Sequence, residues 1–453
     1  MEQQVYQGID VVFGGGKKQI LTTTNGGART DNENLIDSLT NMGYIIVNNK
    51  TELSALPDTV EKVWGHFAMD AMARDLARKN ISTFNSQPSL AQMTDKALRL
   101  LSNSVKGKDK GFFLMIEASQ VDWASHANDP VGVIGEYLAF DSAVTVAYNF
   151  AKSNANTLLL VFSDHDNGGL SLGSSKTDPN YSSRPIDSLL TPSLSNAILD
   201  GASIEAYLGP NRSNTMAISN AVSQYYGISD LTNDELTAIA ASAPGSMEYT
   251  LGPIMSKRTD IGWTTTGHTG NDVPLYYYGT NDHFGLLENT DIAWICAKAM
   301  NLDLNSANNT LFQNASTLFN GMILTIDTTG VNNGKGSLTV SGNGKTAILP
   351  FNKNEIFVDG NKYRMNGLTV YSIKKNAVFV PQQALDLFNG GTVEAIAPAP
   401  IGKIGVQKEI KVELFDMHGR KIFTTTENEY RHAIARKKVA NGNYIIRINN
   451  KII

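Results

Sequence analysis

The stretch Gly111-Phe-Phe-Leu-Met-Ile-Glu117-Ala-Ser-Gln-Val-Asp122-Trp-Ala-Ser-His126 decides how this 453-residue chain folds. In it, an apolar run ends in acidic and histidine side chains. A second stretch, Leu158-Leu-Leu-Val-Phe-Ser-Asp164-His165, repeats that arrangement. An open α/β sheet has its binding crevice outside the carboxyl ends of its strands, so we expect both polar groups at one sheet edge. Carboxylate and imidazole are the ligands that suit zinc where thiolates are absent.

The first 165 residues alternate strand-like apolar runs with amphipathic segments. The strand candidates are Ile9–Phe13, Tyr44–Val47, Phe112–Ile116 and Thr157–Phe162. The helix candidates are Asn32–Asn41, Ala68–Lys79, Ser89–Ser104 and Val133–Lys152. This alternation predicts an α/β fold with a largely parallel central sheet and helices on both faces.

Further along the chain, composition and pattern change twice. Residues 171–260 are rich in Ser, Asn, Asp, Gly and Pro, which indicates an insertion, and a strand near 273–278 and a helix near 291–300 follow it. From about residue 318, short alternating runs between Gly/Asn turns predict a small β domain over 318–389. A Pro/Ala/Gly linker over 390–402 then leads to a second small β module over 403–453.

Composition excludes some functions. With 38 Lys and Arg against 43 Asp and Glu, the net charge of −5 gives no basic footprint for nucleic acid. The sequence contains no run of about eighteen apolar residues, so no membrane span is expected. The first residues, Met1-Glu-Gln-Gln-Val-Tyr, have neither the basic nor the apolar region of a secretory signal peptide.

Three motifs taken together, in order along the chain, resemble the metal ligands of the alkaline phosphatases. They are Glu117 with Asp122 and His126, the Asp164-His165 pair, and Gly267-His268-Thr269-Gly270. The resemblance covers about residues 8 to 302 and implies an alkaline-phosphatase-like metallohydrolase domain over 1–317, with phosphate monoesters as substrates.

The resemblance also implies a set of metal sites. It assigns a first zinc to Asp122, His126 and His268, and three protein ligands leave the open position that a catalytic zinc requires. It assigns a second zinc to Asp164 and His165, and a magnesium ion to Glu117, whose hard oxygen suits that metal. Two zinc ions a few ångströms apart would clamp both ends of an in-line phosphoryl displacement.

The family's serine nucleophile has no counterpart here. In the family it lies in an Asp-Ser-Ala triplet at a strand-to-helix turn, before the first zinc motif. Asp141-Ser142-Ala143 follows that motif and sits within a continuous helical stripe, so we interpret Ser142 as an ordinary helix residue. Gly14-Gly-Gly-Lys17 does not fit the P-loop pattern and indicates a tight turn. We therefore expect an N-terminally truncated chain, inactive as written, with its catalytic residue unknown.

The last fifty residues resemble the C-terminal sorting domains of type IX secretion, with a generic β accessory module as the alternative. The resemblances together imply a periplasmic or extracellular parent protein. They are compatible with a homodimer and with an export machinery as a partner of the C-terminal module. Two other functions stay open: a non-enzymatic zinc- or phosphate-binding pseudoenzyme, and a related phosphodiesterase or sulfatase-like hydrolase.

Overall fold

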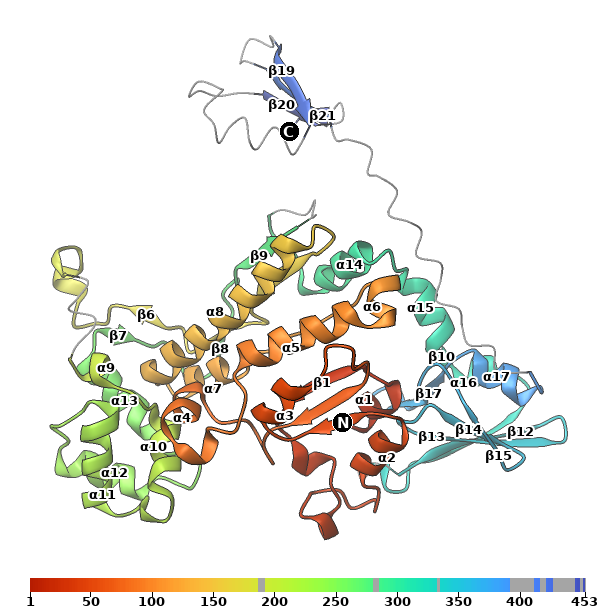
Figure 1. Cartoon of the computed structure of the whole chain (residues 1–453), viewed down its shortest axis with the longest axis horizontal. Coiled ribbons are helices and arrows are strands. Elements are labelled where there is room, and N and C mark those ends of the chain that lie inside the picture. Colours follow the sequence, from red (N-terminus) through yellow and green to blue (C-terminus); the bar gives the residue numbers. More distant parts are fainter. Residues whose placement is uncertain are drawn as a thin grey trace. The chain divides into compact units, whose positions relative to one another are not determined.

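The computed structural model describes residues 1–185, 192–279, 285–331 and 335–391, and the backbone of 411–415, 421–426, 445–448 and 451–452. The chain divides into two compact units, Met1–Ala299 with Asp303–Ile396, and Met300–Leu302 with Ala397–Ile453 (Figure 1). None of the helices within the described ranges combines the length and hydropathy needed to cross a bilayer.

A three-stranded parallel sheet of order β1–β3–β2 lies near the start of the chain. Its strands are β1 (Val11–Gly14), β2 (Ile45–Val47) and β3 (Val63–His66). The central strand β3 was not among the strand candidates, because glycine and histidine interrupt its apolar pattern. Gly65 is needed there, since an added Cβ would lie 2.6 Å from the Phe67 ring and 2.8 Å from the Phe13 ring.

Both faces of this sheet are covered, as the α/β pattern predicts. Trp64 is fully buried in a cluster with Val5, Leu35 and Leu39 of two helices on one side. Val63 packs on the other side with Leu53 and Leu100 of two further helices. Successive residues of a strand point to opposite faces, which is why neighbours in β3 join different clusters.

Eight helices precede the second ligand motif. They are α1 (Glu2–Gln7), α2 (Leu35–Asn41), α3 (Lys50–Ala55), α4 (Asp75–Asn80), α5 (Leu90–Asn103), α6 (Val105–Lys110), α7 (Gln120–His126) and α8 (Pro130–Ser153). Single 3-10 turns, η1 (Lys17–Gln19), η2 (Thr23–Asn25) and η3 (Ser82–Phe84), lie between them. The helix predicted from Ser89 begins with a capping box between Ser89 and Gln92.

The prediction of a largely parallel central sheet holds only in part, because the parallel sheet has three strands and does not include residues 112–116. The predicted strand Phe112–Ile116 does not form, and residues 112–117 make no backbone hydrogen bond to any described residue. The side chains of Phe113 and Met115 are 61% and 74% exposed. An apolar run becomes a strand only when a neighbour completes its hydrogen-bond ladder, and the described chain offers no such neighbour.

The remaining strands of this region pair antiparallel and in twos. They are β4 (Leu159–Phe162) with β9 (Leu275–Tyr278), β5 (Asp166–Asn167) with β8 (His268–Thr269), and β6 (Ser171–Leu172) with β7 (Ile261–Gly262). The predicted strand at 157–162 therefore exists, but its partner is the strand after the insertion.

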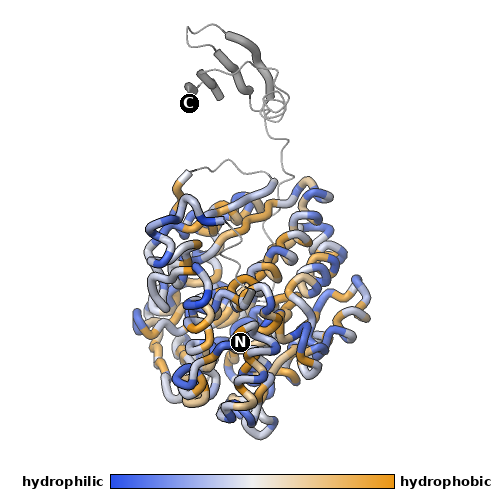
Figure 2. Tube along the Cα trace, turned by 90° about the vertical axis from the view of Figure 1, so that its left-hand side faces the viewer, coloured by the Kyte–Doolittle hydropathy of each residue, from blue (hydrophilic) through white to orange (hydrophobic). Residues whose placement is uncertain are grey.

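The insertion forms a helical subdomain with its own core around Ile204, Tyr226 and Leu251. Its elements are η4 (Asp178–Ser183), α9 (Pro192–Asn196), α10 (Gly201–Leu208), η6 (Gly209–Asn211), α11 (Thr215–Ala221), the π-helical η7 (Val222–Tyr226), α12 (Asn233–Ala241) and α13 (Glu248–Arg258). Two helices, α14 (Asn289–Ala299) and α15 (Leu304–Leu311), follow β9. In Figure 2, hydrophobic and hydrophilic stretches alternate along these segments, as in amphipathic helices.

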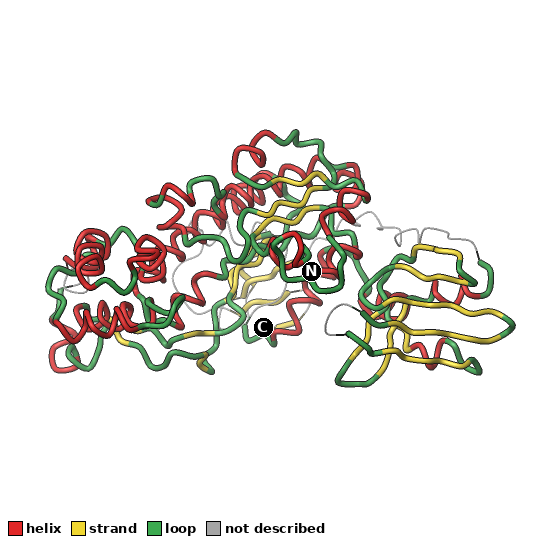
Figure 3. The backbone as a smooth tube through the Cα atoms, turned by 90° about the horizontal axis from the view of Figure 1, so that it is seen from below, coloured by secondary structure: helices red, strands yellow, loops and turns green. Residues whose placement is uncertain are grey.

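The region after residue 312 is mainly antiparallel β structure (Figure 3). A five-stranded meander consists of β11 (Ile323–Asp327), β12 (Ser337–Gly342), β13 (Lys345–Pro350), β14 (Glu355–Val358) and β15 (Asn361–Arg364). A smaller sheet of β10 (Gln313–Asn314), β17 (Ala377–Val380) and β16 (Val370–Ser372) accompanies it, with α16 (Ala315–Leu318) and α17 (Gln383–Phe388).

The second unit contains an antiparallel sheet of order β19–β18–β20–β21. Its strands are β18 (Lys411–Phe415), β19 (Lys421–Thr426), β20 (Ile445–Ile448) and β21 (Lys451–Ile452). The predicted linker, 390–402, lies almost wholly outside the described residues.

Candidate metal centre

Helix α7 presents two of the predicted ligands on one face. Asp122 and His126 are four residues apart, so they lie one above the other on the helix. The distance from His126 Nε2 to Asp122 Oδ2 is 3.5 Å, and both side chains are about one-third exposed. The helix therefore offers a carboxylate and an imidazole to the same point in space.

The third predicted ligand arrives from a distant part of the chain. Strand β8 pairs with β5 so that His268 lies opposite Asn167. One donor atom each of Asp122, His126 and His268 lies within 4.8 Å of the other two, close enough to share a metal ion. The structure thus brings together the three residues that the sequence motifs assign to the first zinc.

One hydrogen bond sets the orientation and the tautomer of the His126 ring. Its Nδ1 lies 2.6 Å from the carbonyl oxygen of Thr266, so Nδ1 carries the proton and donates it. The Nε2 lone pair is then free on the side of Asp122 and His268. Metal-binding histidines use this arrangement, in which an outer carbonyl holds the tautomer that exposes the ligating nitrogen.

Asp122 is oriented by Asn167, a residue that the motifs did not single out. The Asn167 amide donates to Asp122 Oδ1 at 2.6 Å and to the Asp122 carbonyl at 3.0 Å. This leaves Oδ2 turned toward His126. The only signal in the sequence was the closeness of Asn167 to the Asp164-His165 pair.

Gly168 allows α7 and the β5–β8 pair to approach each other. Its φ of +77° lies in the left-handed region that residues with a side chain disfavour. A Cβ at this position would lie 2.8 Å from the Trp263 ring and 3.1 Å from the carbonyl oxygen of Ser125 in α7. A larger residue would push α7, with Asp122 and His126, away from His268.

The residues predicted for the second zinc lie beside this group without joining it. The ring of His165 stacks on that of His268 at 3.6 Å between centroids, and His165 Nε2 is 3.3 Å from Asp164 Oδ2. His165 Nδ1 is buried without a hydrogen-bond partner, whereas the Asp164 side chain is 83% exposed. Within the described ranges, these two residues and Glu117 belong to no cluster of three close donors.

Glu117 ends the unpaired segment 112–117 and is exposed. Because no strand forms there, nothing holds its carboxylate at a sheet edge beside Asp164. The expected convergence therefore takes another form: Asp122 and His126 come from helix α7 and His268 from strand β8, His165 stacks on His268 with Asp164 beside it, and Glu117 stays outside the group.

Ser142 lies inside α8, as its helical stripe predicts. Its hydroxyl donates to the carbonyl oxygen of Leu138 at 2.9 Å, the usual bond of a serine within a helix. The prediction that the helix continues unbroken through Ser142 is confirmed, and the turn predicted at Gly14–Lys17 is also present between β1 and η1.

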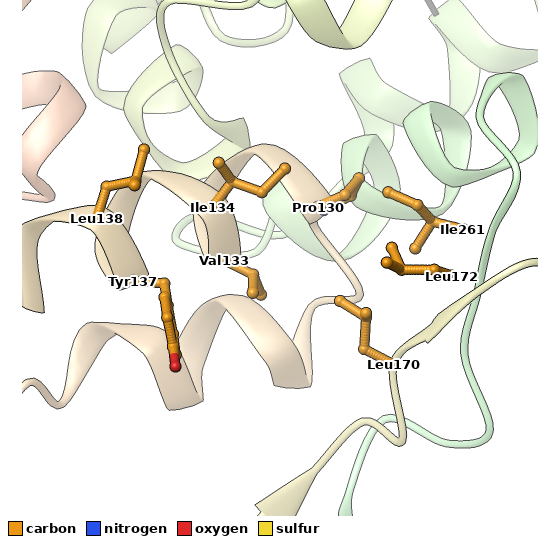
Figure 4. A pocket seen from close by; sticks show the side chains of 8 residues that line it. All are labelled: Pro130, Val133, Ile134, Tyr137, Leu138, Leu170, Leu172 and Ile261. Carbon is orange, nitrogen blue, oxygen red and sulfur yellow. The ribbon is translucent and has the colours of Figure 1, made fainter. Parts of the chain in front are cut away.

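An apolar pocket of about 210 Å³ opens at the start of α8. Side chains of the first turns of α8 face residues of β6 and β7 across it (Figure 4). It is lined by Pro130, Val133, Ile134, Tyr137, Leu138, Leu170, Leu172 and Ile261. None of these side chains is charged or a predicted metal ligand.

Comparison with known proteins agrees with this geometry. Residues 1–302 match the family described as alkaline phosphatase, and residues 399–452 match the secretion system C-terminal sorting domain. Alkaline phosphatase 3 of Bacillus subtilis is 34% identical over 305 residues, which are 65% of this chain and 59% of that protein. The Escherichia coli alkaline phosphatase is 34% identical over 183 residues, 36% of this chain and 38% of that protein.

Solved structures show the same likeness. The Thermus thermophilus alkaline phosphatase has a TM-score of 0.55 at 25% identity, covering 67% of this chain and 64% of that one. A cold-active alkaline phosphatase from a Shewanella species has a TM-score of 0.52 at 25% identity, covering 66% of this chain and 67% of that one. This chain spans somewhat under two-thirds of the Bacillus relative. The match of residues 1–302, two-thirds of the sequence, shows that the chain belongs to the alkaline phosphatase family.

Proposed function

We propose that residues 1–302 form the metal-holding part of a phosphate monoester hydrolase, with a first zinc bound by Asp122, His126 and His268. The observation that carries this proposal is the convergence of their donor atoms within 4.8 Å. The carbonyl of Thr266 supports it, because that carbonyl holds His126 in the tautomer that a metal needs. The family match favours phosphate monoesters over the phosphodiesterase or sulfatase-like alternative.

The residues around the proposed metal sites have separate roles. A bound zinc supplies Lewis acidity toward a phosphoryl oxygen. Asn167 keeps Asp122 Oδ1 occupied, so that Oδ2 faces the metal position. His165 and Asp164 would form the protein part of a second zinc site, and Glu117 would contribute to a magnesium site.

Metal analysis after dialysis tests the first site. We expect the purified chain to retain one zinc, and His268→Ala to lose most of it, because only two protein ligands remain. His165→Ala is the matched control: it removes the histidine stacked on His268 but leaves all three proposed ligands. Equal zinc loss in both variants, or two tightly held zinc ions in the unmodified chain, would contradict this assignment.

We propose further that turnover requires a nucleophile from a polypeptide segment that this sequence does not carry. Ser142 is committed to α8, and the chain spans 59% of its Bacillus subtilis relative. The unpaired apolar segment 112–117 supports the proposal, because a strand added beside it would cover Phe113 and Met115 and order Glu117. Fusing the unmatched part of that relative to residue 1 should create phosphatase activity. A folded fusion without activity would count against the proposal.

The alternative is a protein that binds zinc or phosphate without catalysis. The same three-donor group supports it, and it predicts zinc retention with no gain of activity in the fusion. For the C-terminal module, the match to sorting domains supports an exported protein handled by a secretion system. Deleting the module should keep the protein inside the cell, and unchanged export would refute that role.

A further inference from the structure

Arg74 lies buried at the junction between the metal-binding helix and the helical subdomain. Its side chain is 6% exposed. Its Nη1 donates to the carbonyl oxygen of Gln120 at 3.1 Å, and its Nη2 donates to Glu248 Oε2 at 2.5 Å. Its Nε lies 3.8 Å from Asp200 Oδ1. One guanidinium thus reaches three different elements.

Each of these partners occupies a helix start. Gln120 is the first residue of α7, Glu248 is the first residue of α13, and Asp200 caps α10. Figure 1 shows α10 and α13 in the subdomain formed by the insertion. The planar fork of arginine can hold several acceptors at fixed angles, which a lysine ammonium cannot do. Arg74 therefore ties the subdomain to the residue two positions before Asp122.

The far end of α7 is held by the same subdomain. Asp129, which is fully buried two residues after α7 and its cap, accepts from Gly201 N–H at 2.7 Å and from Tyr226 O–H at 2.8 Å. The Ser256 hydroxyl donates to the carbonyl oxygen of Asn128 at 3.1 Å. The start of α7 is thus bonded to Arg74, which in turn contacts the insertion. The residues that follow α7 are bonded directly to the insertion.

The helix needs this support. With seven residues α7 is far below the length at which an isolated helix is stable, and only Ala124 and Ser125 of it are buried. Its placement therefore depends on bonds to its surroundings, both at its two ends and through the contacts of Asp122 with Asn167 and of His126 with Thr266. The angle at which Asp122 and His126 face His268 follows from that placement.

We propose that Arg74 is a positioning residue for the metal centre, through which the helical subdomain sets the pose of Asp122 and His126. This inference rests on the zinc assignment above. Arg74 forms no hydrogen bond or ion pair with a proposed ligand among the described residues, and its link to α7 is the bond to the Gln120 carbonyl.

Cobalt substitution tests the inference, because the visible spectrum of bound Co²⁺ reports ligand geometry. Arg74→Lys keeps the charge but loses the fork. We expect its zinc affinity to fall about 10-fold, the lower end of the loss caused by removing a direct hydrogen-bond partner of a metal ligand, and its cobalt spectrum to change. Arg258→Lys is the matched control, since Arg258 joins Asp230 and Glu235 within the subdomain and contacts no residue of α7. It should lower the melting temperature and leave zinc affinity and spectrum unchanged.

The outcomes separate this inference from the zinc assignment. If the unmodified chain binds neither zinc nor cobalt, the zinc assignment fails and this inference falls with it. If the unmodified chain binds and Arg74→Lys matches it in affinity and spectrum, only the role of Arg74 is refuted. Equal effects of Arg74→Lys and Arg258→Lys would also refute it.

A second variant covers the case in which Arg74→Lys does not fold. Replacing Arg74→Met together with Glu248→Gln and Asp200→Asn removes the guanidinium and both carboxylates that face it, a kind of change that proteins often tolerate. The carbonyl of Gln120 still loses its donor in this triple variant. We expect the same loss of zinc affinity, and unchanged affinity would overturn the inference.

Discussion

Replacing Glu136 by glutamine should make the protein more stable at alkaline pH. Glu136 lies in α8, is 8% exposed, and accepts a hydrogen bond from the Asp75 N–H at 2.6 Å. Burial raises the pKa of its carboxyl from 4.5 to about 7, although the Asp75 bond and Arg74 act to lower it. The folded protein therefore holds a proton on Glu136 at pH values where the unfolded chain has released it.

The sign of the effect follows from proton linkage. Because the folded state binds the proton more tightly, the free energy of unfolding falls as pH rises from about 4.5 to about 7, and stays lowered above that range. At about 1.4 kcal/mol per pH unit, a pKa raised from 4.5 to about 7 corresponds to about 3 kcal/mol. Glu136→Gln should recover up to that amount at pH 9, because glutamine can still accept from Asp75 and never ionises.

Urea denaturation of both proteins at pH 5 and pH 9 measures this difference. The variant and the unmodified protein should be close in stability at pH 5, and the variant should be more stable at pH 9. Glu235→Gln is the opposite control: its hydrogen bonds with Arg258 lower the pKa of Glu235 to about 2, so its loss should destabilise at both pH values. A Glu136→Gln variant that is less stable than the unmodified protein at pH 9 would refute the reasoning.

Three further outcomes are expected. The purified, zinc- and magnesium-loaded chain should hydrolyse p-nitrophenyl phosphate little or not at all, and Ser142→Ala should behave identically; strong activity abolished by that substitution would make Ser142 the nucleophile. Deleting residues 403–453 should leave zinc content and melting temperature nearly unchanged, and a large drop in melting temperature would show that the module packs on the core. Lys353→Met should lower the melting temperature, because Lys353 Nζ donates to Glu33 at 2.8 Å where the meander region contacts the start of the chain. An unchanged melting temperature would show that this ion pair does not contribute to stability.

Local sequence pattern was sufficient for the features that one segment encodes alone. The spacing of Asp122 and His126 places both on one helical face, whatever surrounds the helix. The continuous stripe around Ser142 predicts a helix without a break, and the structure has one from Pro130 to Ser153. The capping residues at Ser89 mark a helix start because their hydrogen bonds close within four residues.

Tertiary structure decided what depends on partners far away in the chain. The apolar run 112–116 has the composition of a strand, yet it remains unpaired because a ladder needs a neighbour that local sequence cannot supply. Strand β3 is central although its own pattern is interrupted, since strands on both sides complete its hydrogen bonds.

The metal centre shows the same division. The motifs identified Asp122, His126 and His268, because carboxylate and imidazole side chains carry the chemistry wherever they lie. Their approach to one another depends on the β5–β8 pairing and on the bond from Asn167 to Asp122, which join residues 45 or more positions apart. Each residue type determines its own side-chain chemistry, so the sequence alone gives the candidate ligands. The distances between these side chains and their orientations result from long-range packing and hydrogen bonding, which exist only in the folded chain.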